Sequence, residues 1–99
     1  MKIRYSKAFI KSASKLTGKY KASLKNKIEE VKMVSFVDEI TGCSKLEGFI
    51  HTYRIRIGDY RVFFIFRISE NTAVFEYLIS RGDAYNKEYL KSLGKKEKG

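Results

Sequence analysis

The sequence has few of the residues on which several kinds of fold and site depend. Its 99 residues include one cysteine and one histidine, which excludes a disulfide framework and leaves too few ligands for a zinc site of the usual kind. No apolar run approaches the roughly 20 residues that a transmembrane helix needs, and the first residues contain no signal-peptide core. We therefore expect a cytoplasmic protein without a metal or another cofactor.

Acidic residues are also scarce. There are 11 Asp and Glu against 21 Lys and Arg, which gives a formal charge of +10. Seven Phe and seven Tyr supply the apolar area that disordered chains lack, and a chain of this length forms one domain that buries roughly two-thirds of its unfolded surface. The charge calls for an anionic partner, and nucleic acid, an acidic protein and an anionic membrane surface all fit it.

The first third of the chain has a helical pattern. After a short strand at residues 3–5, Ser6 is placed to cap a helix. An apolar stripe then continues through Phe9, Ile10, Ala13 and Leu16. Thr17 and Gly18 interrupt it, and a second stripe follows through Tyr20, Leu24, Ile28 and Val31. These patterns predict a helical hairpin, and we expect irregular backbone over residues 34–48.

The second half alternates with the period of strands. Predicted strands at 52–57, 60–68 and 73–80 are joined by turns at Gly58-Asp59 and Glu70-Asn71, and a helix is expected over residues 84–93. The order β-α-α-β-β-β-α predicts an α+β fold, in which an N-terminal helical hairpin packs on one face of a small antiparallel sheet and a C-terminal helix follows. Residues 1–93 form the single domain, and residues 94–99 are expected to be a frayed basic tail.

The register of the first predicted hairpin gathers arginines on one face. A two-residue turn at Gly58-Asp59 pairs Arg56 with Arg61 and Arg54 with Phe63. Like charges directly opposite each other destabilise a sheet, and a bound phosphate or carboxylate would remove the repulsion because guanidinium groups pair with both. The alternative is that these are solvated arginines on an exposed face. A base-stacking role for Phe63 or Phe66 is a further option, although a strand phenylalanine is more often part of the core.

The register of the second hairpin is less certain. A turn centred on Glu70-Asn71 places Ser80 beside Arg61 and puts Glu76 on the arginine face, either as a base or as the structural partner of an arginine. Arg81 then points to the core face or lies beyond the strand end, unless a one-residue bulge brings it to the arginine face.

Three segments resemble a known family. Residues 46–48 (LEG), 53–62 (YRIRIGDYRV) and 81–85 (RGDAY) resemble motifs of the RelE/ParE superfamily of bacterial type II toxins. The expected element order is also that of the family, so the resemblance covers nearly the whole chain. The second block is fairly specific, whereas the third is short.

The resemblance implies a ribosome-dependent endoribonuclease that cleaves messenger RNA and is held inactive by an acidic antitoxin. Its implied partners are that antitoxin, the ribosome and messenger RNA, without a membrane or a cofactor. Carried over by motif, Arg56, Arg61, Arg81 and Tyr85 are catalytic candidates. The RNA-binding candidates are Arg54, Arg56 and Lys87.

The sequence departs from the family pattern where a proton-transfer group is expected. Some family members carry lysine at the positions of Arg54 and Arg56, and arginine is a poor base. Ile79 and Ser80 replace a glycine-histidine pair, and His51 is expected to be an ordinary surface residue. The general acid and base stay unassigned, and two alternatives remain: a non-catalytic gyrase inhibitor resembling ParE, and a degenerate domain that only binds the antitoxin.

Overall fold

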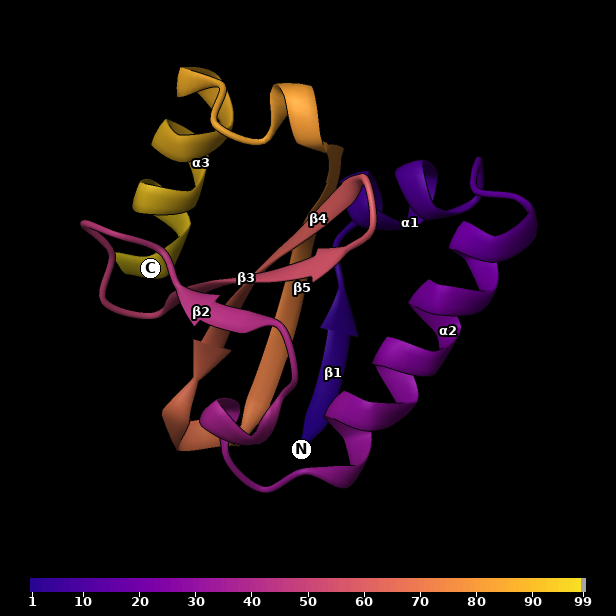
Figure 1. Cartoon of the computed structure of the whole chain (residues 1–99). Coiled ribbons are helices and arrows are strands. Elements are labelled where there is room, and N and C mark those ends of the chain that lie inside the picture. Colours follow the sequence, from indigo (N-terminus) through magenta and orange to yellow (C-terminus); the bar gives the residue numbers. More distant parts are fainter. Residues whose placement is uncertain (99) are drawn as a thin grey trace.

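The chain folds around a five-stranded sheet with helices on both faces, as the computed structural model of residues 1–98 shows (Figure 1). The strands are β1 (Lys2–Tyr5), β2 (Cys43–Lys45), β3 (Thr52–Ile57), β4 (Tyr60–Arg67) and β5 (Thr72–Ser80). The helices are α1 (Lys7–Ala13), α2 (Gly18–Met33) and α3 (Lys87–Lys98), and three short 3₁₀ turns are η1 (Val37–Glu39), η2 (Ile68–Glu70) and η3 (Arg81–Asp83). The α+β class and the helical hairpin are therefore confirmed.

The sheet is larger and more mixed than the sequence predicts. Its order is β1-β5-β4-β3-β2, and β1 pairs parallel to β5 whereas the other pairs are antiparallel. The strand β2 lies within the segment expected to be irregular, because Cys43 to Lys45 add to the edge of β3. Only three residues pair there, which is too short for a detectable alternation.

Two apolar clusters hold the layers together, one on each face of the sheet. The first lies under α1 and α2 and includes Phe9, Leu24, Val31, Phe64 and Phe75. The second lies under α3 and includes Leu46, Phe63, Ile65, Ile79, Ala84 and Leu93. The helical hairpin therefore covers one face of the sheet, and α3 lies on the opposite face (Figure 1).

The helical hairpin forms with two local differences from the predicted pattern. The Ser6 hydroxyl caps α1 as expected, since it accepts the Phe9 N–H at 3.0 Å. However, α1 ends at Ala13, so Leu16 is a buried residue of the loop that connects the two helices. Ile10 is 55% exposed and does not belong to the buried stripe.

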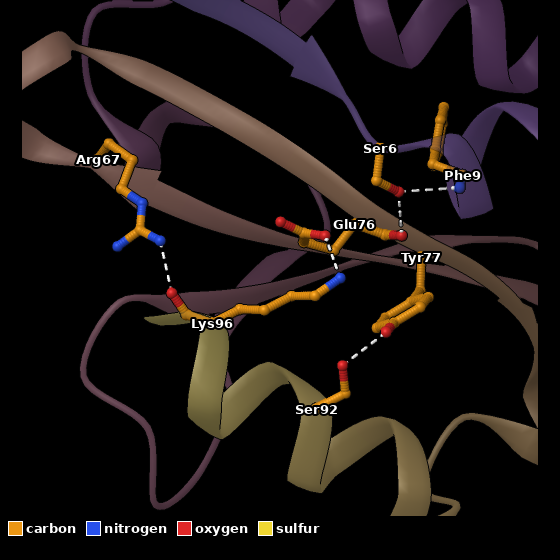
Figure 2. Close-up of polar contacts among 7 residues, drawn as sticks. All are labelled: Ser6, Phe9, Arg67, Glu76, Tyr77, Ser92 and Lys96. Carbon is orange, nitrogen blue, oxygen red and sulfur yellow. Dashed lines mark hydrogen bonds and ion pairs between the residues drawn. The ribbon is translucent and has the colours of Figure 1, made fainter. Parts of the chain in front are cut away.

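The C-terminal helix begins and ends later than the sequence predicts. In place of a frayed tail, residues 94–98 form the last turns of α3, and Gly99 lies outside the described residues. The Arg67 guanidinium donates to the Lys96 carbonyl at 2.5 Å (Figure 2) and to the Glu97 carbonyl at 3.1 Å. The Glu97 carboxylate accepts the N–H groups of Ile50 and His51 at 3.1 and 2.8 Å. These side-chain bonds tie the end of the helix to the sheet.

Candidate anion-binding site

The β3–β4 hairpin has the predicted register. Ile57 faces Tyr60 across the Gly58-Asp59 turn, Arg56 faces Arg61, and Arg54 faces Phe63. Gly58 adopts a φ of +56°, a left-handed conformation that suits glycine. The three arginines therefore share one face, at the end of the sheet where this turn lies.

Arg61 is a buried cation that forms no ion pair with a carboxylate of residues 1–98. It is 8% exposed, and its Nη1 donates to the carbonyls of Gly58 and Tyr60 at 2.8 and 2.9 Å. Burial lowers the pKa of the guanidinium most, followed by the charges of Arg56 and Arg54; Tyr85 partly offsets this, and Arg81 lowers it further. The pKa is lowered overall, first because burial disfavours the charged form and then because other positive groups lie nearby.

Arg54 holds the hydroxyl of Tyr85. Its Nη1 donates to the Tyr85 Oη, and its Nη2 donates to the Ser44 Oγ at 3.2 Å. The Nε of Arg54 is buried and has no partner in the described part of the chain, whereas Tyr85 is 53% exposed. Ser44 is a site contact that the sequence did not indicate, because it belongs to the unpredicted strand β2.

Arg81 lies beyond the end of β5 and reaches the same cluster. It begins η3, its side chain is exposed, and its N–H donates to the Asp59 carbonyl at 2.7 Å. Of the positions that the sequence left open, Arg81 therefore takes the one beyond the strand end, and its charge contributes to the lowered pKa of Arg61. Lys87, the first residue of α3, is exposed. We use the name arginine cluster for Arg54, Arg56, Arg61 and Arg81.

The second hairpin has a different register from the one expected, because of its turn and of a bulge in β5. The pairing already differs beside the turn, where Arg67 faces Thr72; it shifts again between Phe63 and Phe64, so Arg61 faces Ile79 and Ser80 faces Tyr60. The extra residue on β5 is Glu76, and its carboxylate accepts from the Lys96 Nζ at 3.0 Å (Figure 2). Glu76 is therefore the partner of a lysine in α3 and not of an arginine.

Other residues considered from the sequence lie away from the cluster. Phe63 is fully buried and Phe66 packs against the core under α1 and α2, so neither offers a ring for base stacking at the cluster. His51 precedes β3, at the end opposite Arg56, where Glu97 binds its N–H. Burial raises the pKa of the Cys43 thiol to about 12, which keeps the thiol neutral.

The cluster has the chemistry of a site for phosphate oxygens. None of its four arginines forms an ion pair with a carboxylate of residues 1–98. Guanidinium groups bind such oxygens through charge-assisted, often bidentate, hydrogen bonds. Within those residues no group of three or more His, Cys, Asp or Glu side chains is arranged to hold a metal ion, and no helix is long and apolar enough to cross a membrane.

The sequence resembles that of one known toxin. No family model matches the sequence. Toxin RelE3 of Methanocaldococcus jannaschii is 26% identical over 87 residues, which are 87% of this chain and 97% of that protein.

Solved structures share the fold. The RelB-RelE antitoxin-toxin complex of Methanococcus jannaschii contains a chain with a TM-score of 0.70 and 24% identity, over 85% of this chain and 96% of that one. The isolated RelE toxin of E. coli has a TM-score of 0.66 and 15% identity, over 95% of this chain and 96% of that one. The chain is therefore similar in sequence to Toxin RelE3 and shares the fold of these RelE chains.

Proposed function

We propose that this chain is the toxin of a type II toxin–antitoxin pair and acts as a ribosome-dependent endoribonuclease on messenger RNA. The observation that carries the proposal is the arginine cluster, in which a buried Arg61 lies among like charges without a carboxylate of residues 1–98 to neutralise it. A fold under selection for stability alone gains nothing from this arrangement, whereas a transferring phosphate would be stabilised by it.

The arginine cluster supplies the positive charges that the proposed reaction needs to stabilise its transition state. The 2′-hydroxyl of a ribose gives up its proton to solvent water and attacks the adjacent phosphorus, the bond from phosphorus to the 5′-oxygen breaks, and a 2′,3′-cyclic phosphate remains while the 5′-oxygen takes up a proton. Arg61 and Arg81 would stabilise the negative charge that develops on the phosphorane, and Arg56 would bind the RNA backbone. Lys87 would contribute a peripheral backbone contact.

Tyr85 is the group to which we assign proton transfer. Its hydroxyl is bound by Arg54 at the cluster, and it is half-exposed, so it can meet a bound nucleotide. We assign it the delivery of a proton to the leaving 5′-oxygen, with Arg54 orienting the hydroxyl. Its ring is also free to stack on a base.

An acidic antitoxin is the proposed protein partner. Residues 1–33 contain ten basic and two acidic side chains, so most of the net charge lies on β1 and the helical hairpin. A positive surface of this kind suits an acidic segment that folds on binding. The solved RelB-RelE complexes contain such a pairing of antitoxin and toxin, which supports the proposal for this chain.

The test is induction of this chain in a bacterial host, with and without its proposed antitoxin, followed by mapping of new RNA 5′ ends. We expect new ends within translated messages, and we expect the antitoxin to suppress them. Intact messages with trapped gyrase and broken DNA would instead indicate a gyrase inhibitor. Growth arrest that Arg61→Ala leaves unchanged would exclude an active role for the cluster.

A further inference from the structure

The β3–β4 turn supplies three successive carbonyl groups to the arginine cluster. The carbonyls of Gly58 and Tyr60 accept from the Arg61 Nη1 at 2.8 and 2.9 Å. The carbonyl between them, that of Asp59, accepts the Arg81 N–H at 2.7 Å. The position of this one turn therefore fixes both the guanidinium of Arg61 and the backbone that carries Arg81.

Tyr20 of α2 holds this turn in place. The Tyr20 hydroxyl donates to the Asp59 Oδ2 at 2.7 Å, and the Tyr20 ring packs edge-on against Tyr60, with 5.1 Å between the ring centroids. The same ring closes on Gly58, where an added Cβ would lie 3.1 Å from the Tyr20 Cε1. Tyr20 thus contacts all three residues whose carbonyls serve the cluster.

The Tyr20–Asp59 hydrogen bond persists across the neutral pH range. This hydrogen bond to the Asp59 carboxylate is the main cause of the raised pKa of the Tyr20 phenol, which therefore stays protonated. Asp59 forms no ion pair with any basic side chain of residues 1–98. The Asp59 carboxylate thus accepts from a phenol and forms no ion pair that would occupy a guanidinium of the cluster.

We propose that Tyr20 and Asp59 are positioning residues that hold Arg61 and Arg81 in place for the scissile phosphate. They act through the β3–β4 turn. Because Tyr20 lies in α2, the helical hairpin also supports the site. This inference rests on the proposed function, because its kinetic consequence is defined for RNA cleavage. Its binding consequence is independent of cleavage, since it concerns any phosphate held by the cluster.

The kinetic test compares two variants that each lose one tyrosine hydroxyl. Tyr20→Phe removes the bond to Asp59, and Tyr77→Phe removes a bond of equal length, 2.7 Å, to Ser92 in α3 (Figure 2). We expect Tyr20→Phe to lower kcat about 10-fold with KM changed less than about 2-fold, because misplaced catalytic groups reduce the rate more than overall RNA affinity. Tyr77→Phe should leave both constants within about 2-fold of the wild type.

A rescue series separates positioning from a general loss of stability. Asp59→Asn keeps an oxygen that accepts from Tyr20, so we expect a kcat between those of the wild type and Asp59→Ala. Melting temperatures of the tyrosine variants should fall by similar amounts, since each loses one hydrogen bond of ordinary strength. Equal kcat values for Tyr20→Phe and Tyr77→Phe would overturn the proposal.

A binding measurement tests the positioning even if the protein cleaves no RNA. Pyrophosphate should raise the melting temperature of the wild type and of Tyr77→Phe, because a ligand that binds the folded state stabilises it. We expect Tyr20→Phe to lose at least about half of that rise. If pyrophosphate raises the melting temperature of Tyr20→Phe as much as that of the wild type, the positioning role is refuted. If the rise is reduced in Tyr20→Phe as expected but the wild type cleaves no RNA, only the nuclease activity is refuted.

Discussion

Arg56 and Arg61 face each other across β3 and β4, which predicts a conflict between stability and activity. We expect Arg56→Gln to stabilise the fold and to weaken the function. Arg56 is exposed, so its replacement removes charge without opening a cavity. Arg61 is buried and keeps its hydrogen bonds to the turn.

The expected magnitude follows from the cross-strand geometry. Like charges directly opposite each other cost roughly 0.2–1 kcal/mol, and solvent around the exposed Arg56 favours the middle of this range. A gain of about 0.5 kcal/mol in the free energy of unfolding corresponds to a rise of about 2–4 °C in melting temperature for a domain of this size. Loss of the proposed charged hydrogen bond from Arg56 to RNA should weaken binding by about 10-fold or more.

The assay is thermal unfolding at low ionic strength, paired with RNA binding or cleavage. Lys45→Gln is the matched control, because it removes one positive charge from an exposed strand position that faces Tyr53 and no arginine. Salt should reduce the difference between Arg56→Gln and the wild type through screening. A melting temperature of Arg56→Gln at or below that of Lys45→Gln would refute the conflict between the two arginines.

Three further outcomes test the site and its support. Tyr85→Phe should reduce the cleavage rate about 10–100-fold, because a general acid contributes at least that much, and it should shift the free energy of unfolding by less than about 1.5 kcal/mol; a full rate would remove Tyr85 from the mechanism. Leu93→Ala should cost about 2–5 kcal/mol in denaturant unfolding because Leu93 is fully buried, and a cost below about 1 kcal/mol would show that α3 is not firmly docked. Burial raises the pKa of Glu97, but the hydrogen bonds from Ile50, His51 and Thr52 outweigh it and lower the pKa overall. The stability that these bonds give is complete above the pKa of Glu97 in the unfolded chain, and it is lost as the pH falls through the lower pKa of the folded protein. The melting temperature should therefore fall below about pH 4.5, and Glu97→Gln should weaken this dependence; an unchanged pH profile in that variant would contradict the assignment.

The arginine face could be predicted because strand alternation and a two-residue turn together determine a register. Tyr53 to Ile57 alternate strictly, and Gly58-Asp59 permits one pairing of the two strands. The burial of Arg61 could not be predicted, because its guanidinium is held by carbonyl groups of the turn. Sequence patterns report side-chain type and not the direction of a carbonyl.

The rest of the site depends on contacts between segments that are distant in sequence. The bulge at Glu76 is associated with the Ser6 hydroxyl, which donates to the Glu76 carbonyl at 2.6 Å while it caps α1 (Figure 2). No pattern within β5 shows this displacement. The end of α3, for which the sequence predicts a frayed tail, likewise depends on distant contacts, since Arg67 and Glu97 bind it to the sheet.

The most direct test of the central claim is the cleavage of a translated message by purified ribosomes with wild-type protein, Arg61→Lys and Arg61→Ala. Lysine keeps the charge but cannot reproduce the planar donors that reach Gly58 and Tyr60. We predict new RNA 5′ ends with the wild type, a rate lower by about 10-fold or more for Arg61→Lys, and a greater loss for Arg61→Ala. Equal cleavage by all three folded proteins would contradict the claim that the arginine cluster stabilises the transferring phosphate.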